Sequence, residues 1–240
     1  MTDKKTESDH LAETLAKLLT AALPHAPFDG WSAETFNAAV TDSGVALDLA
    51  KSAAPRGSID LAVAYHRQGD AAMVAALQAA DLSSMRFRDR ITFAVRTRIQ
   101  DADREIVRRG ITLFALPIHA AEGAKLLWGT ADTIWSTLGD TSRDYNWYSK
   151  RTILSGVYSA TLLYWLGDES EDASATWEFL DRRIEGVMQF EKVKADLRSN
   201  KLASTLLAGP KSLLSHITAP GERGSAGTRL PVGLPGHRSK

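Results

Sequence analysis

The spacing of apolar residues between positions 144 and 167 limits the possible folds of this chain more than any other feature. Threonine and large apolar residues recur there three or four positions apart, at Leu154, Val157, Tyr158, Thr161, Leu162 and Trp165. In an α-helix this spacing puts all of them on one face. Asp144 or Asn146 can cap the first turn, and Gly167 ends the pattern. The sequence therefore predicts a long helix that buries one face, as in a helical bundle.

Two neighbouring segments, residues 119–138 and 170–188, repeat this pattern and predict two further helices. We expect the three apolar faces to meet in a ligand-binding bundle that occupies residues 58–196. Aromatic and methionine side chains are numerous on these helices, and such side chains line many cavities between helices. The residues predicted to line a cavity are Trp128, Trp135, Tyr158, Leu162, Trp165, Trp177 and Met188. Ordinary core packing is the alternative interpretation for each of them.

Residues 58–80 predict another helix, which Ser58 caps and which is interrupted at Gly69 and Asp70. Farther along, apolar residues recur every four positions between 87 and 99, and arginines crowd the positions between them. Acidic residues, among them Asp89, are interspersed with these arginines. We interpret the segment as a helix with a solvent-exposed face crossed by ion pairs, because a nucleic-acid surface would not alternate its charges in this way.

Residues 1–57 predict a separate domain of three short helices. The second begins after Ser32, which can cap it, and a turn containing Gly44 leads to the third. This is the layout of a helix-turn-helix domain. The third helix offers Lys51 as its basic side chain, beside Asp48, and the whole chain carries 29 basic and 29 acidic residues. Reading bases and neutralising phosphates both require more positive charge, so we expect no nucleic-acid partner.

Basic residues dominate after Asp196, and apolar residues recur among them. We expect a hinged amphipathic helix over residues 197–218 that binds a membrane surface, and a disordered basic tail over residues 219–240. The predicted membrane-binding residues are Leu202, Leu206, Leu207, Leu213, Leu214 and Ile217. Packing of this helix onto a partner subunit or onto its own domain is the alternative.

No apolar run in the sequence approaches the roughly 20 residues that cross a bilayer. Residues 1–7 have neither the apolar segment of a secretory signal nor the acid-poor, arginine-rich composition of a transit peptide. We therefore expect a bacterial cytoplasmic protein that is peripheral on the inner membrane.

The signatures of common enzymes are missing. The chain has no G-x-S-x-G, no G-x-G-x-x-G and no Walker phosphate loop, and it has no cysteine for thiolate catalysis or zinc ligation. Glu7 with His10, and His119 with Glu122, have spacings seen in metal sites, but neither pair comes with the further ligands that such sites need. We expect no catalytic residue, no metal and no cofactor. A metal-dependent enzyme or a hydrolase is the alternative.

Residues 139–151 are predicted to form a polar loop that runs into the long helix and contains aromatic residues. Trp147 and Tyr148 stand where the helix begins, close to acidic side chains such as Asp144. Aromatic anchors surrounded by polar groups are typical of protein–protein interfaces. One interpretation is a docking patch, and the other is a hydrophobic lid on the end of the bundle.

Several motifs resemble those of the COQ-nine family, accessory proteins of ubiquinone biosynthesis with a TetR-like fold. They are Ala131-Asp132-Thr133-Ile134-Trp135, Gly139-Asp140-Thr141-Ser142, Asp144, Asn146-Trp147-Tyr148, Arg151 and the segment from Thr176 to Ile184. The resemblance extends from about Leu11 to Ile217. It implies an all-α, TetR-like helical bundle with an N-terminal helix-turn-helix-like domain of three helices and a C-terminal amphipathic helix, assembled as a homodimer.

The resemblance also implies a function. We expect a non-enzymatic, lipid-binding accessory protein that binds polyprenyl quinone intermediates at the membrane and presents them to the demethoxyubiquinone hydroxylase. The family's surface for that partner maps by motif onto Asp132, Asp144, Trp147 and Tyr148. No motif carries over the family's lipid-lining residues, so the cavity residues named above rest on helical spacing. The alternative function is a TetR-type, ligand-responsive transcriptional regulator.

Overall fold

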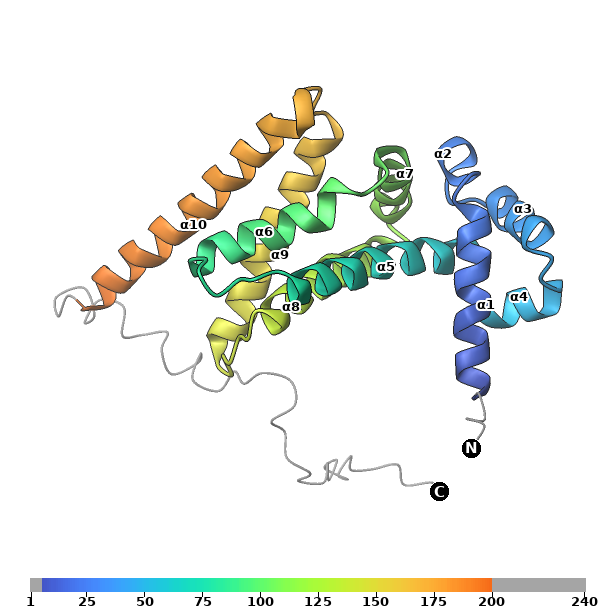
Figure 1. Ribbon diagram of the computed structural model, residues 1–240, viewed down its shortest axis with the longest axis horizontal. Coiled ribbons are helices and arrows are strands. Elements are labelled where there is room, and N and C mark those ends of the chain that lie inside the picture. The colour runs from blue at the N-terminus through green and yellow to red at the C-terminus, as the bar shows by residue number, and fades with distance from the viewer. Residues whose placement is uncertain (1–5, 200–240) are drawn as a thin grey trace, which may run out of the picture.

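Helices make up the regular structure of residues 6–199, the part of the chain that the computed structural model describes; the side chains of residue 188 and of residues 190–199 are not described. In order, the elements are α1 (Glu7–Ala22), α2 (Ala26–Asp29), α3 (Ala33–Ser43), α4 (Leu47–Ala53), α5 (Ser58–Ala79), α6 (Phe87–Gln100), α7 (Arg104–Ala115), α8 (Ala120–Thr137), α9 (Tyr145–Leu166), the 3-10 helix η1 (Glu171–Ala173) and α10 (Ser174–Ser199). No strand occurs in this range, and the prediction of an all-α fold is confirmed (Figure 1).

The first four helices pack around a small core at one end of the molecule, drawn in blue in Figure 1. Ser32 caps α3 as predicted, because its hydroxyl accepts a hydrogen bond from the N–H of Thr35 (3.3 Å). Gly44 ends α3 with a φ of 64°, a left-handed conformation that glycine adopts freely. Leu61 of α5 and Ile106 of α7 complete this core. The N-terminal helices are therefore attached to the rest of the chain by shared apolar packing, and a domain boundary at residue 57 stays a prediction.

Helix α5 runs without interruption from Ser58 to Ala79, so the predicted break at Gly69 and Asp70 is wrong. The predicted cap at Ser58 is also wrong, because Gly57 is the N-cap and Ser58 is the first helical residue. Gly69 lies directly against the guanidinium group of Arg98 on α6; a Cβ atom at Gly69 would come within 2.6 Å of its central carbon. Asp70 binds the same guanidinium, with 2.7 Å between Asp70 Oδ1 and Arg98 Nε. Gly69 leaves room for Arg98 and Asp70 binds it, so both residues allow α6 to pack against α5. This tertiary packing outweighs the low helix propensity of glycine.

The larger core lies among α5, α6, α8, α9 and α10. Helix α9 leads through η1 into α10, which runs back beside it (Figure 1). The predicted helix from Asp144 to Gly167 is confirmed: the Asp144 carboxylate accepts a hydrogen bond from the N–H of Asn146 (3.0 Å), and Gly167 is the C-cap. The side chains of Leu154, Tyr158 and Trp165 are buried, as the spacing predicts.

The arginines at the start and at the end of α6 differ in their surroundings. Arg86 and Arg88 pair with Asp89 at 2.8 and 3.1 Å on the exposed surface, as predicted for a face crossed by ion pairs. Arg98 departs from that prediction because its side chain is buried and pairs with Asp70. The departure follows from its position, since α6 turns this residue towards α5 rather than towards solvent.

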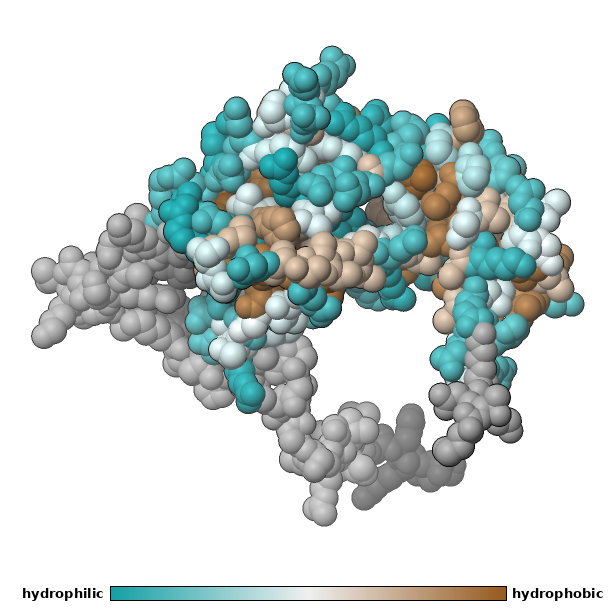
Figure 2. Space-filling model, viewed as in Figure 1, coloured by the Kyte–Doolittle hydropathy of each residue, from teal (hydrophilic) through white to brown (hydrophobic). Residues whose placement is uncertain are grey.

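Hydrophobic residues, brown in Figure 2, gather along the seam between the N-terminal helices and the bundle. No helix in the described part of the chain is long and apolar enough to cross a membrane. The predicted membrane-binding residues Leu202, Leu206, Leu207, Leu213, Leu214 and Ile217 lie outside the described residues, as does the predicted tail. Helix α10 continues past residue 196 to Ser199, and residue 218 lies outside the described residues, so both segment boundaries stay predictions.

Candidate functional site

Arg151 of α9 organises the region around the polar loop. It is the largest fully buried side chain among the described residues. Its Nε donates a hydrogen bond to Asp132 Oδ1 on α8 (2.5 Å), and its Nη1 donates to Asp140 Oδ2 in the loop (3.0 Å) and to the Trp147 carbonyl (3.1 Å). The guanidinium carbon lies 4.0 Å from the centre of the Trp147 ring. One side chain therefore ties two helices and the loop between them to an aromatic ring.

Asp140 anchors the loop from the other side. Its side chain is only 2% exposed, and Oδ1 accepts hydrogen bonds from Lys150 Nζ (2.8 Å) and Ser142 Oγ (2.8 Å). Burial, the largest single influence, opposes ionisation of this carboxyl, but the hydrogen bonds from Lys150, Ser142 and Arg151 together outweigh it and lower its pKa to about 2. The loop is therefore held by an ionised carboxylate whose charge is matched by two cations.

Three aromatic rings gather above this network. The ring centres of Trp147 and Tyr148 are 4.8 Å apart and meet edge to face, and Trp128 of α8 lies 5.8 Å from Trp147 and 6.3 Å from Tyr148. All three rings are half-buried. Asp132 is 43% exposed and reaches the group through Arg151. We call Trp128, Asp132, Asp144, Trp147 and Tyr148 the aromatic patch.

The structure brings together most of the predicted partner-binding residues. Asp132, Trp147 and Tyr148 meet around Arg151 and Trp128, whereas Asp144 caps α9 and also accepts a hydrogen bond from Asn146 Nδ2 (2.9 Å). Trp128, predicted to line a cavity, belongs to this patch. Arg151 was part of a family motif, but its role as the hub required knowledge of which residues surround it.

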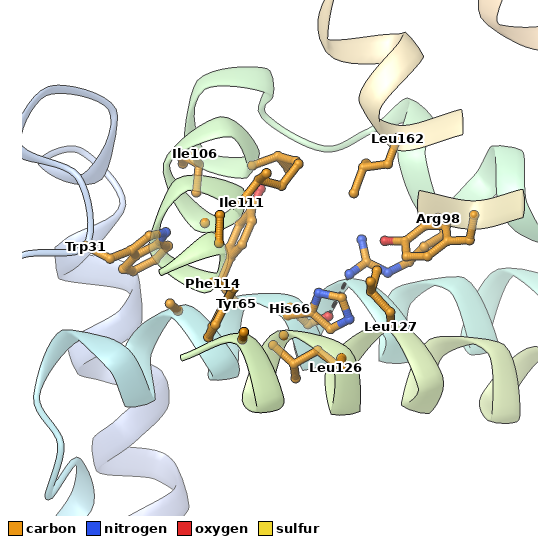
Figure 3. A pocket seen from close by; sticks show the side chains of 18 residues that line it. Trp31, Tyr65, His66, Arg98, Ile106, Ile111, Phe114, Leu126, Leu127 and Leu162 are labelled. Atoms are coloured by element: carbon orange, nitrogen blue, oxygen red, sulfur yellow. Dashed lines mark hydrogen bonds between the residues drawn. The ribbon is translucent and has the colours of Figure 1, made fainter. Parts of the chain in front are cut away.

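A first cavity, which we call the junction cavity, lies between the N-terminal helices and the bundle (Figure 3). Its volume is about 360 Å³, near the lower end of the range of about 300–1,000 Å³ for small-molecule sites. The wall comes from α5, α6, α7, α8, α9 and the loop before α3, and it is mostly apolar. Its main apolar side chains are Trp31, Ile106, Ile111, Phe114, Leu127 and Leu162.

Polar side chains are concentrated at one end of the junction cavity. Figure 3 shows His66 and Arg98 side by side there, with Trp31 at the opposite end. Arg98 donates hydrogen bonds to Asp70 (2.7 Å) and to the His66 carbonyl (2.9 Å). The Thr130 hydroxyl lies 2.8 Å from His66 Nε2 and 2.9 Å from Asp70 Oδ1. Burial lowers the pKa of His66 to about 4, so this imidazole is neutral near pH 7.

A second cavity, which we call the loop cavity, lies next to the polar loop and the N-terminal part of α9. Its volume is about 510 Å³, and residues of α6, α8, the loop, α9 and α10 line it. The apolar part of its wall includes Phe87, Ile91, Trp135, Leu154, Val157 and Ile184. Asp140, Ser142 and Lys150 form its polar rim. Asp140 therefore lines the loop cavity and also binds Arg151, which supports Trp147 of the aromatic patch.

The predicted cavity residues are distributed over several places. Tyr158 and Leu162 line the junction cavity, and Trp135 lines the loop cavity. Trp165 is buried in the core beneath Arg104, and Trp177 lies half-exposed beneath Arg96. The side chain of Met188 lies outside what the structure describes.

Sequence reasoning missed the contribution of Trp31, Tyr65, His66 and Arg98 to the junction cavity. These residues belong to three segments far apart in the chain, and helical spacing within one segment contains no information about which segments meet. Gly123, which also lines the cavity, was the available signal for close helix approach, because a Cβ atom there would come within 2.8 Å of the Cβ atom of Phe114.

The two pairs with metal-site spacing show no site in the described residues. Glu122 forms an ion pair with Arg56 (3.2 Å), which links the start of α8 to the end of the N-terminal helices. No group of three or more His, Cys, Asp or Glu side chains suited to a metal ion occurs in residues 6–199 outside the side chains left undescribed.

Comparison with known proteins identifies the family. The family model COQ9 matches residues 120–191, which include the aromatic patch and α9. The ubiquinone biosynthesis protein COQ9 from Rattus norvegicus, described as mitochondrial, is 30% identical over 220 residues, covering 86% of this chain and 69% of the rat protein. The Homo sapiens protein of the same description is 28% identical over 220 residues, covering 86% of this chain and 68% of the human protein.

A solved structure supports the fold. The TetR transcriptional regulator from Nitrosomonas europaea superposes with a TM-score of 0.59 at 20% sequence identity, covering 72% of this chain and 97% of the regulator. The prediction of a TetR-like fold is thereby confirmed. With the rat COQ9 protein at 30% identity, the chain belongs to the COQ9 family, the COQ-nine family that its motifs resemble, and is a ubiquinone biosynthesis protein.

Proposed function

We propose that this protein is a non-enzymatic accessory protein that binds a polyprenyl quinone intermediate inside its helical bundle and presents it to the demethoxyubiquinone hydroxylase. The observation that carries the proposal is the arrangement around α9. This helix contributes Tyr158 and Leu162 to an apolar cavity, and its first turn supplies Trp147 and Tyr148 to the aromatic patch. One helix thus connects a place for an apolar ligand with a surface for a partner.

The apolar wall of the junction cavity suits an isoprenoid lipid. Burial of apolar surface contributes about 25 cal/mol per Å², or about 0.8 kcal/mol for each methylene group. One or two buried isoprene units would therefore contribute several kcal/mol. A cavity of about 360 Å³ accommodates the ring and the first part of such a chain, and the remainder of a long chain extends beyond it.

The aromatic patch suits a protein partner. Interfaces depend on a few anchors, in which tryptophan, tyrosine and arginine are enriched. Here Arg151 stacks on Trp147 and binds its carbonyl group, so the indole is held in place before any partner arrives. A preorganised anchor loses little conformational entropy on binding, which favours docking over the alternative of a simple lid.

Transcriptional regulation is not favoured, although the fold is that of a TetR protein. Helix α4, the counterpart of a recognition helix, has only seven residues and carries Asp48 beside Lys51. The COQ9 relatives are described as ubiquinone biosynthesis proteins. Peripheral binding to a membrane, through the predicted helix over residues 197–218, and assembly as a homodimer complete the proposal.

Identification of bound lipid tests the proposed ligand. The full chain is purified gently from a quinone-producing host, and native mass spectrometry is followed by lipid extraction. We expect polyprenyl quinones or their precursors to co-purify. Protein that carries only bulk phospholipid, or no lipid, would contradict lipid presentation.

Substitution of both Trp147 and Tyr148 by lysine tests the partner surface. We expect capture of the hydroxylase in a pull-down assay to be lost, because the substitutions remove the two aromatic anchors. Phe28→Lys is the matched control, since Phe28 is an aromatic residue that is 80% exposed on α2. Continued capture by the double variant would refute the docking surface, and a large fall in Tm would favour the lid.

A further inference from the structure

Tyr158 is a buried side chain of the junction cavity whose hydroxyl forms no hydrogen bond within the described residues. It is 1% exposed and contributes to the cavity wall. Every side-chain nitrogen or oxygen in the described residues that is fully shielded from solvent has a hydrogen-bond partner. The Tyr158 hydroxyl has none within the same residues, and hydrogen bonding is not among the influences on its pKa. The hydroxyl oxygen is therefore open to the cavity.

The surroundings of Tyr158 favour a neutral ligand. Arg98, whose guanidinium carbon lies 5.9 Å from the centre of the Tyr158 ring, is already paired with Asp70 at 2.7 Å. The buried His66 is neutral near pH 7. An anionic ligand would have to compete with Asp70 for Arg98, and a cationic ligand would have to compete with Arg98 for Asp70. The charges of Arg98 and Asp70 cancel and His66 is neutral, so this end of the cavity carries no net charge.

We propose that the Tyr158 hydroxyl is the head-group receptor of the junction cavity and forms a hydrogen bond with a ring oxygen of a neutral quinone or phenol. This inference rests on the proposed lipid function and specifies how the ligand lies. The ring occupies the polar end near Arg98, and the isoprenoid chain extends along Phe114 towards Trp31. A tyrosine hydroxyl can donate to a quinone carbonyl and can accept from a phenol, so one group serves both oxidation states of the ring.

The protonation state of Tyr158 is consistent with this role. Burial raises its pKa to about 12, so the hydroxyl keeps its proton and remains a donor throughout the physiological pH range. A buried polar group without a partner carries a desolvation cost, and a ligand oxygen would remove that cost. The ring would be held away from water until the lipid is released to the partner.

Tyr158→Phe tests the receptor role because it removes the hydroxyl and keeps the ring. Binding to the full chain is measured by isothermal titration calorimetry in one detergent, with two probes: ubiquinone with two isoprene units, and an isoprenoid hydrocarbon of similar size without oxygen. We expect the substitution to weaken quinone binding about fivefold, the range typical of one buried hydrogen bond, and to leave hydrocarbon binding unchanged. The Tm should not fall, since no hydrogen bond within the described residues is lost.

Tyr164→Phe is the matched control, because Tyr164 lies on the same helix but is 40% exposed and stacks on Phe179. It should change neither affinity. Unchanged quinone binding by Tyr158→Phe, an equal loss for both probes or a lower Tm would each overturn the receptor role while the lipid function stands. A wild-type protein that binds no quinone would instead refute the proposed lipid function, and with it this inference.

Discussion

Arg98 and Arg151 are both buried and both ion-paired, yet they organise regions of opposite character. Arg151 has carboxylates on two sides, a backbone carbonyl and an aromatic ring around it, and it supports a surface. Arg98 has one carboxylate and one carbonyl, and it borders a cavity into which a tyrosine hydroxyl opens. The Arg151 network uses its hydrogen-bonding groups within the protein and makes the surface above it rigid. The Arg98 network lies beside the Tyr158 hydroxyl, which has no hydrogen bond within the described residues, and so leaves a polar group for a ligand.

Removal of the Arg151 charge should cause a larger loss of stability than any substitution near Arg98. Arg151→Met leaves Asp140 with Lys150 but without its second cation, and breaking a buried ion pair costs about 3–5 kcal/mol. Because Lys150 remains, we expect the lower end, about 3 kcal/mol, which corresponds to a fall in Tm of roughly 6–12 °C. Differential scanning calorimetry measures it.

Arg86→Met is the control for that substitution. Arg86 pairs with Asp89 on the surface, where its side chain is 71% exposed, so we expect a loss below about 1 kcal/mol. If the two substitutions had equal effects, the Arg151 network would not be the support of the aromatic patch.

Acid should weaken the Arg151 network through Asp140. The folded-state pKa of Asp140 is about 2, below the value of about 3.9 for an unfolded aspartate. The stabilisation is therefore present above about pH 4 and is lost as the pH falls through 2. It amounts to about 2 kcal/mol.

Asp140→Asn isolates this effect. The difference in free energy of unfolding between wild type and variant, measured by urea titration at pH 5 and pH 2, should shrink by about 2 kcal/mol at the lower pH. Asp168, whose pKa is lowered by hydrogen bonds from Ser170 and Thr176, is present in both proteins and cancels. A constant difference would show that Asp140 titrates normally.

Substitution of two glycines tests the surroundings of Arg98 and should have the smallest effect on stability. Gly69→Ala places a methyl group 2.6 Å from the Arg98 guanidinium, which Asp70 and His66 hold in place. The clash should exceed the gain in helix propensity, with a net loss of about 1 kcal/mol. Gly156 of α9 has open space at the same position, so Gly156→Ala should stabilise the protein by up to about 1 kcal/mol. Chemical denaturation of both variants decides whether Gly69 is needed for Arg98.

The outcomes for individual residues show how far sequence reasoning reached. A cap at Asp144 or Asn146, the stop at Gly167 and the buried stripe of α9 were predicted because all three depend on residues close together in the chain, and the structure places the cap at Asp144. The break at Gly69 was wrong because a local rule for glycine does not include a distant arginine. Trp128 shows the same limit, since helical spacing placed it on a helix without telling that Trp147 and Tyr148 would cover it.

The sequence by itself determined the all-α class, the extent of α9 and the membership of the COQ9 family, because caps, apolar spacing and motifs are properties of contiguous residues. Only the tertiary structure decided that Arg151 holds the aromatic patch, that α9 lines two cavities and that the Tyr158 hydroxyl opens into one of them. These features arise where helices from distant parts of the chain meet. Their geometry depends on packing and on the pairing of buried charges, and neither is contained in the spacing of residues along one helix.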